Sequence, residues 1–144
     1  MKFEDLDDIL TIENESFTTP WSRGSFESEL LNNMALYICL ECNDKVVAYA
    51  GIWKIYDEGH ITNVAVLPSY RGLGLSKLLL DYLFEECIKN EIVRVTLEVR
   101  ESNIVAIKLY EQLGFINTGK RPRYYSNPIE DAIIMWKELK NEKY

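Results

Sequence analysis

The chain has 144 residues, of which 47% are hydrophobic and 27% are charged, a composition typical of one soluble globular domain over residues 1–144. Its formal net charge of -7 disfavours a nucleic-acid partner, because an acidic surface repels phosphates, and weakly favours a cationic one. No apolar run approaches the ~18 residues of a membrane-spanning helix, and the acidic N-terminus does not resemble a secretory signal. We therefore expect a cytoplasmic protein with no membrane partner.

The three cysteines do not indicate a disulfide framework, because their number is odd and no secretory signal accompanies them. Cys39 and Cys42 form a C-x-x-C pair, the spacing of some metal and redox sites. A zinc site needs further ligands, and the chain has a single histidine. We interpret Cys39 and Cys42 as ordinary strand residues and predict no metal site.

The first half of the chain predicts two helices followed by strands. Hydrophobic spacing predicts a helix over residues 4–17, and the Thr-Thr-Pro segment ends it. Ser22 is placed to cap a second helix that runs to about Asn33. Two strands, 36–42 and 45–53, are joined by a short turn. A loop over 56–59 then leads to a third strand over 60–67.

The second half alternates helices and strands. Leucines at helical spacing predict an amphipathic helix over 75–90. Alternating apolar and polar residues predict a strand over 93–100. Another helix begins at Ser102 or Asn103 and ends at Gly114, and two strands follow over about 115–124 and 131–139. This order predicts an α/β fold with a central mixed sheet and helices on both faces.

The most informative segment joins the third strand to the helix over 75–90. Residues 68–77 contain Gly72 and Gly74, which allow backbone N–H groups to turn toward a ligand at a helix N-terminus. Such a turn favours a phosphate or pyrophosphate. The spacing alone also fits a tight strand–helix turn with no ligand.

The segment Arg71–Ser76, RGLGLS, resembles the Q/R-x-x-G-x-G/A loop that holds the acetyl-CoA pyrophosphate in GNAT N-acetyltransferases. Ser76 replaces the usual Gly or Ala and is also small. The segments FTTPWS (17–22), LEVRESN (97–103), AIKLYEQLGF (106–115) and RYY…EDAIIM (123–135) resemble the RimI-type members of that family. The resemblance implies the GNAT acyl-CoA N-acyltransferase fold. Because only Met1–Phe3 precede the first helix, we expect the usual first strand to be short or missing.

The resemblance also implies where acetyl-CoA binds. The loop over 71–77 would hold the pyrophosphate, backbone groups of the third strand would contact the pantetheine arm, and Asn103 would touch the same arm. The predicted contacts are Val64, Ala65, Val66, Arg71, Gly72, Leu73, Gly74, Leu75, Ser76, Lys77 and Asn103.

Two residues are candidate catalytic groups. Glu98 lies on the polar side of its strand, where it fits either an ordinary paired carboxylate or a general base. Tyr110 shares a helix face with Asn103, where it fits either core packing or a proton donor to the departing thiolate. The resemblance implies the base for Glu98 and the acid for Tyr110.

The acceptor groove is less well defined. Trp21, Tyr124 and Tyr125 are candidates for a peptide groove, and ordinary aromatic packing explains them equally well. Glu13 and Asp131 are carboxylates of the type that receives an ammonium, but such residues are too common on surfaces to be predicted as a site. His60 is expected to be a plain strand residue.

RimI-type enzymes acetylate the N-terminal alanine of a small-subunit ribosomal protein. The resemblance therefore implies transfer from acetyl-CoA to such an α-amine by direct attack, with a protein N-terminus as partner. Another acceptor, namely a lysine side chain, a different N-terminus or a small amine, stays open. So does a non-catalytic CoA-binding or assembly module, and the sequence indicates no oligomeric state.

Overall fold

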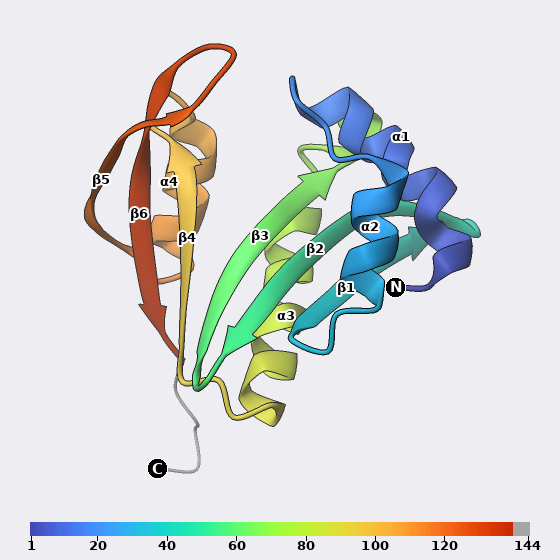
Figure 1. Ribbon diagram of the computed structural model, residues 1–144, viewed down its shortest axis with the longest axis horizontal. Helices are drawn as coiled ribbons and strands as arrows, with labels where there is room; N and C mark the ends of the chain where they lie inside the picture. Colours follow the sequence, from blue (N-terminus) through green and yellow to red (C-terminus); the bar gives the residue numbers. More distant parts are fainter. Residues whose placement is uncertain (140–144) are drawn as a thin grey trace.

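The computed structural model describes residues 1–139 and has a six-stranded sheet flanked by helices (Figure 1). The helical elements are η1 (Phe3–Asp5), α1 (Leu6–Ser16), α2 (Arg23–Leu30), η2 (Pro68–Tyr70), α3 (Leu75–Lys89) and α4 (Ile104–Gln112). The strands are β1 (Ala35–Cys42), β2 (Lys45–Ile55), β3 (Glu58–Val66), β4 (Arg94–Arg100), β5 (Ile116–Tyr125) and β6 (Glu130–Glu138). The predicted order of helices and strands is confirmed.

The differences from the predicted bounds have local causes. Helix α2 ends at Leu30, and the Asn32 side chain then accepts a hydrogen bond from the Met34 backbone N–H in a turn. The loop predicted over 56–59 shrinks to two residues, because Tyr56 adopts a positive φ of 56° and closes a tight hairpin between β2 and β3. The single-turn helix η1, rather than a strand, precedes α1.

The sheet order is β1-β2-β3-β4-β6-β5. All neighbouring pairs are antiparallel except β3 and β4, which run parallel. Their register covers only three residue pairs and ends at His60 and Thr96. Beyond this point β3 and β4 separate, and Figure 1 shows them diverging toward their carboxyl ends. The sheet therefore opens at its centre, where a ligand can reach the edges of both strands.

Helices cover both faces of the sheet (Figure 1). Leucines of α3 pack with apolar residues of β2, β3, β4 and β6 in one core cluster, and α4 packs against the same cluster. Helices α1 and α2 cover β1, β2 and part of β3 in a second cluster around Phe26 and Tyr49. The alternation predicted over 93–100 is confirmed, because Val95, Leu97 and Val99 are buried. No helix within residues 1–139 is both long and apolar enough to cross a membrane.

Candidate active site

Strand β3 contains a bulge just beyond the point where its pairing with β4 ends. Gly51 of β2 pairs with Asn63 and Ile52 pairs with Ile61, so Thr62 has no register partner on β2. An extra residue of this kind reverses which face the following side chains take. Ile61 and Val64 accordingly pack with the α3 cluster, whereas Ala65 packs with the α1 cluster. The bulge lies where β3 leaves β4.

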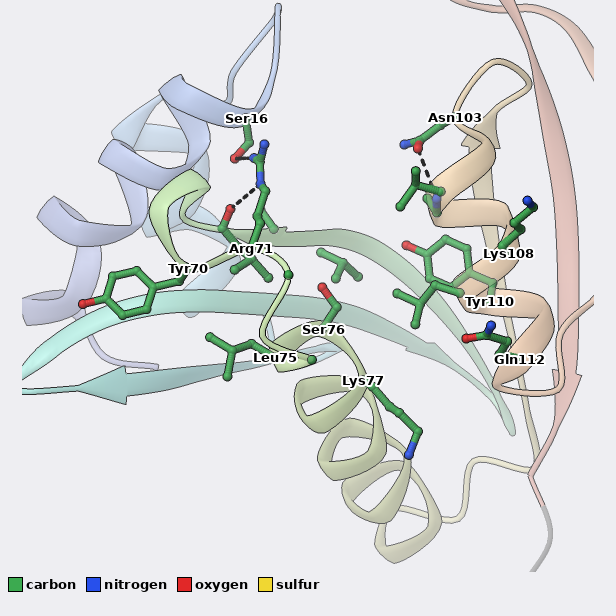
Figure 2. A pocket seen from close by; sticks show the side chains of 18 of the residues that line it. Ser16, Tyr70, Arg71, Leu75, Ser76, Lys77, Asn103, Lys108, Tyr110 and Gln112 are labelled. Carbon is green, nitrogen blue, oxygen red and sulfur yellow. Dashed lines mark hydrogen bonds between the residues drawn. The ribbon is translucent and has the colours of Figure 1, made fainter.

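The first cavity, which we call the glycine-loop cavity, has a volume of about 710 Å³. The segment between β3 and α3 forms one wall and α4 forms the other; Figure 2 shows Arg71, Ser76 and Lys77 across from Asn103, Lys108 and Tyr110. Its charged lining residues are Arg71, Lys77 and Lys108, with no Asp or Glu among them. In a chain with a net charge of -7, a cavity lined only by cationic charges favours an anionic ligand.

The loop geometry fits a phosphate-bearing ligand. Gly72 and Gly74 have φ values of 81° and 77°, in the left-handed region that favours glycine. A Cβ added at either glycine would meet nothing within 4 Å, so the space beside the backbone is open. Helix α3 begins at Leu75, and the free N–H groups of its first turn carry the positive end of the helix dipole.

Arg71 anchors the loop to its surroundings. Its Nε donates to the Val66 carbonyl oxygen at 3.1 Å and its Nη2 donates to the Ser16 Oγ at 3.0 Å (Figure 2). These contacts connect the loop to the end of β3 and to the end of α1. Arg71 therefore both adds positive charge and fixes the loop.

The second cavity, which we call the acidic cavity, has a volume of about 410 Å³ and lies between the diverging parts of β3 and β4. It contains Glu13 and Glu98, and its one cationic residue is Arg100. Arg100 contacts Glu130 at 3.3 Å and lies over the Tyr125 ring, so its charge is already partnered. The two cavities share the residues Ser16, Phe17, Val64, Asn103, Ala106 and Tyr110.

Glu98 is held at the edge of the acidic cavity. Its side chain is 9% exposed, and its Oε2 lies 2.6 Å from His60 Nε2. Its Oε1 lies 3.9 Å from Arg121 Nε. Arg100, a cationic residue on the same strand, pairs with Glu130 instead of with Glu98. Glu98 is therefore fixed by contacts and still faces the cavity.

His60 is a functional candidate that the sequence interpretation missed. It was expected to be a plain strand residue, but its ring nitrogen contacts the candidate base. The two residues are 38 positions apart, and they meet because His60 pairs with Thr96, two residues before Glu98 on the same face of β4. A parallel register of this kind is not encoded by local spacing.

Tyr110 lies where the two cavities meet. It projects from α4 and its ring packs edge-on against Phe115, with ring centroids 5.6 Å apart. Burial raises the pKa of Tyr110 to about 12, because the phenolate is poorly solvated there. The hydroxyl therefore stays protonated at neutral pH and is available as a proton donor.

Most of the other predicted site residues line the two cavities. Val64, Ala65, Val66, Leu75 and Asn103 line the glycine-loop cavity. Asn103 is also the N-cap of α4, since its Oδ1 accepts from the Ala106 N–H at 3.2 Å. This capping hydrogen bond gives Asn103 a structural role that does not depend on a ligand.

Two predicted site residues, Leu73 and Tyr124, and the carboxylate of Asp131, which was considered but not predicted, lie outside the cavities. Leu73 is 68% exposed and does not line the glycine-loop cavity. Trp21 and Tyr125 line the acidic cavity, but Tyr124 does not; it is 47% exposed and packs edge-on against Tyr125. Asp131 accepts a hydrogen bond from the Arg123 N–H instead of lining the cavity.

Within residues 1–139 no group of three or more His, Cys, Asp or Glu side chains is placed to hold a metal ion. Cys39, Cys42 and Cys87 are free thiols, and Cys39 and Cys42 both lie on β1.

Comparison with known proteins agrees with this geometry. Residues 6–115 match the model of the acetyltransferase (GNAT) family. A Bacillus subtilis protein, whose name of ribosomal protein bS18-alanine N-acetyltransferase carries the qualifier "putative", is 42% identical over 137 residues, which cover 94% of this chain and 91% of the relative. The ribosomal protein bS18-alanine N-acetyltransferase of Escherichia coli K12 is 39% identical over 133 residues, covering 91% of this chain and 89% of the relative.

A solved structure shows the same fold. The crystal structure of the ribosomal-protein-S18-alanine N-acetyltransferase from Escherichia coli superposes with a TM-score of 0.90 at 36% sequence identity. The match covers 98% of this chain and 92% of that chain. The chain therefore belongs to the acetyltransferase (GNAT) family and, within it, to the RimI-type acetyltransferases.

Proposed function

We propose that this protein transfers the acetyl group of acetyl-CoA to the α-amine of the N-terminal alanine of ribosomal protein bS18. The observation that carries this proposal is the meeting of a cationic and an acidic cavity at Tyr110, in the opening between β3 and β4. The first suits a phosphate-bearing donor and the second suits a cationic amine. The names of the relatives support bS18 as the acceptor.

In this proposal acetyl-CoA binds in the glycine-loop cavity and supplies an acetyl thioester. The backbone N–H groups at the start of α3, with Arg71 and Lys77, hold the pyrophosphate. Backbone groups of Val64–Val66 lie along the pantetheine arm in the manner of an added strand. An N–H group there also polarises the thioester carbonyl.

Glu98 acts as the general base. An unperturbed terminal α-ammonium has a pKa of about 7.7–8.0, whereas an unperturbed lysine ammonium has a pKa of about 10.4. Deprotonating lysine at neutral pH costs roughly 3.5 kcal/mol more, because each pKa unit corresponds to about 1.4 kcal/mol. A carboxylate that acts directly or through one water is therefore better suited to the α-amine.

Tyr110 acts as the general acid. The ammonium gives one proton to Glu98, and the neutral amine attacks the thioester carbonyl to form the new C–N bond. The C–S bond then breaks, and the thiolate takes the Tyr110 proton. The nitrogen loses its second proton, which returns through solvent to the Tyr110 phenolate, and Glu98 releases the first proton to solvent. One acetamide, one thiol and one released proton balance the reaction.

The raised pKa of Tyr110 fits this role. It keeps the phenol protonated until the thiolate forms, and the same dry surroundings raise the proton affinity of the thiolate. Trp21 and Tyr125 would line the peptide path into the acidic cavity. We further propose that residues 1–144 act as one GNAT domain in the cytoplasm, where ribosomal proteins are made.

The test is CoA release from acetyl-CoA with two short peptides. One peptide begins with a free alanine in the bS18 sequence, and the other has a blocked N-terminus and an internal lysine. We expect turnover on the free-alanine peptide alone. Turnover on the blocked peptide alone would overturn the proposed acceptor and keep the transferase chemistry. No turnover on either, with acetyl-CoA bound, would favour a different acceptor or a non-catalytic CoA-binding module.

A further inference from the structure

Three polar side chains are buried together where α1 packs on β2 and β3. Glu13 is 1% exposed, and its Oε2 accepts a hydrogen bond from the Trp21 backbone N–H at 2.8 Å. Its Oε1 accepts a hydrogen bond from the Tyr49 hydroxyl, and that hydroxyl also interacts with the Asn63 side chain. Glu13 and Asn63 both line the acidic cavity, so this buried polar group has one side open to a ligand.

Asn63 carries an acceptor atom with no partner. The residue is 7% exposed, and its Oδ1 makes no hydrogen bond to any residue that the structure describes. This carbonyl oxygen belongs to a residue that lines the acidic cavity, and the Tyr49 hydroxyl gives its proton to Glu13 rather than to Asn63. A buried acceptor without a donor is unfavourable, so a donor is expected from a bound molecule.

The Glu13 carboxyl group has no cationic partner. Across residues 1–139, no Lys, Arg, His or chain N-terminus comes within 4.0 Å of its oxygens. Burial raises the pKa of this carboxyl, because the carboxylate has lost much of its hydration. An ionised carboxylate can accept about four hydrogen bonds, and two are used here. What this site lacks is a cation with several N–H donors.

We propose that Glu13 and Asn63 form the docking subsite for the ammonium group of the acceptor. This inference rests on the proposed function, because it assigns the end of the acceptor that is acetylated. An N-terminal ammonium has three N–H donors: Asn63 Oδ1 accepts one of them, and Glu13 supplies the opposite charge. Glu98, in the same cavity, then removes one proton and frees the lone pair for attack. Glu13 and Asn63 thus bind and orient the amine, whereas Glu98 deprotonates it.

A purely structural role for these residues predicts a different result. If Glu13 and Asn63 only hold α1 against the sheet, their substitution lowers stability and affects all ligands of the acidic cavity equally. If they bind the ammonium, the loss is confined to ligands that carry one. Two peptides separate these cases: an alanine-starting peptide, and its des-amino analogue in which a hydrogen replaces the terminal amine.

The experiment measures the Kd of both peptides for the CoA-loaded protein, in which no acetyl group is available for transfer. The variants are Asn63→Leu, which removes the carbonyl acceptor, and Glu13→Gln, which keeps the shape and removes the charge. Asn90→Leu, at the end of α3, is the matched control. We expect the wild type and the control to bind the amino peptide roughly 10- to 100-fold more tightly, as for a hydrogen bond to a charged group, and each variant to lose most of that preference.

The outcomes separate the two proposals, because turnover of the wild type on the same amino peptide is measured in parallel. Equal affinity of the wild type for the two peptides, or binding of neither, would overturn the subsite, even where the peptide is acetylated. A preference that survives in both variants would also overturn it. A preference that is lost in the variants, with no wild-type turnover, would keep the subsite and reject the proposed acceptor. If Asn63→Leu does not fold, Glu13→Gln alone decides.

Discussion

The two cavities that meet at the opened part of the sheet are lined by different kinds of chemical groups. The glycine-loop cavity is lined by a turn, a helix N-terminus and three cationic side chains, so the binding that we propose there depends largely on backbone conformation. The acidic cavity is formed by side chains from α1, the segment after it, β3, β4, α4 and β5, and its character depends on which distant residues meet. A backbone site tolerates many side chains, whereas a site of converging side chains can be lost through one substitution.

Removing the charge of Glu98 is expected to have the largest effect on the chemistry of the acidic cavity without affecting acetyl-CoA binding in the glycine-loop cavity. We expect Glu98→Gln to lower kcat/KM for the alanine peptide by about 10²- to 10⁴-fold, the usual contribution of a general base. The Kd of acetyl-CoA should stay unchanged, because Glu98 does not line the glycine-loop cavity. Steady-state kinetics and calorimetry measure the two quantities. Glu101→Gln, at a half-exposed neighbour paired with Lys120, is the control, and an equal loss there would remove Glu98 from its role.

Gly74→Ala is the converse variant, which should weaken ligand binding in the glycine-loop cavity and leave the acidic cavity unchanged. An alanine at a φ of 77° is strained by about 1–2 kcal/mol, and its methyl group would enter the open space beside the loop. We expect a roughly 10- to 100-fold weaker Kd for acetyl-CoA, the cost of losing a hydrogen bond to a charged group, while the affinity for the peptide is retained. Gly24→Ala is the control, because a Cβ added at Gly24 in helix α2 would meet no atom closer than 3.8 Å. It should leave both affinities intact. Unchanged acetyl-CoA binding in Gly74→Ala would show that the ligand does not approach this backbone.

Removing cationic side chains from the glycine-loop cavity tests how much charge contributes to acetyl-CoA binding there. We expect the double variant Lys77→Gln, Lys108→Gln to bind acetyl-CoA roughly 3- to 10-fold more weakly, because exposed charges contribute little each in water. The difference from wild type should shrink as salt rises. Titrations at low and high salt test this, with Lys89→Gln at the other end of α3 as the control. A loss that does not depend on salt would indicate a packing effect instead of a charge effect.

The smallest expected effect concerns Tyr110 at high pH. Its pKa of about 12 in the folded protein exceeds the unfolded value of about 10, so the folded state binds this proton more tightly. The stabilisation is complete below pH 10 and is lost as pH rises toward 12, by about 1 kcal/mol near pH 11. Urea unfolding at pH 9 and 11 should show a smaller alkaline loss in Tyr110→Phe than in the wild type. Tyr56→Phe, at an exposed tyrosine, should lose the same unfolding free energy between pH 9 and 11 as the wild type. An equal loss in Tyr110→Phe would show that the pKa of Tyr110 is not raised.

The sequence predicted the residues that line the glycine-loop cavity more completely than those that line the acidic cavity. Apolar periodicity and the glycines at 72 and 74 are local signals, and they placed β3, the loop and α3 correctly. Leu73 was included by position in the motif, but it points to solvent, because a motif does not say which of its side chains face the ligand.

The residues that sequence analysis missed depend on tertiary register. His60 meets Glu98 only because β3 and β4 pair in parallel up to Thr96. Asn63 turns toward α1 because Thr62 bulges out of the register. Glu13 was noted among ordinary carboxylates, and only its burial separates it from them. Pairing register and bulges are set by packing of the whole sheet, so they leave no local pattern to read.

The most direct test of the two-cavity account is a crystal structure of the protein with CoA and an alanine-starting peptide bound together. The account predicts the pyrophosphate on residues 71–77, the sulfur beside Tyr110 between the cavities, and the peptide amine in the acidic cavity with Glu98. A pyrophosphate held away from the glycine loop, or a peptide amine that reaches the sulfur without entering the acidic cavity, would contradict it.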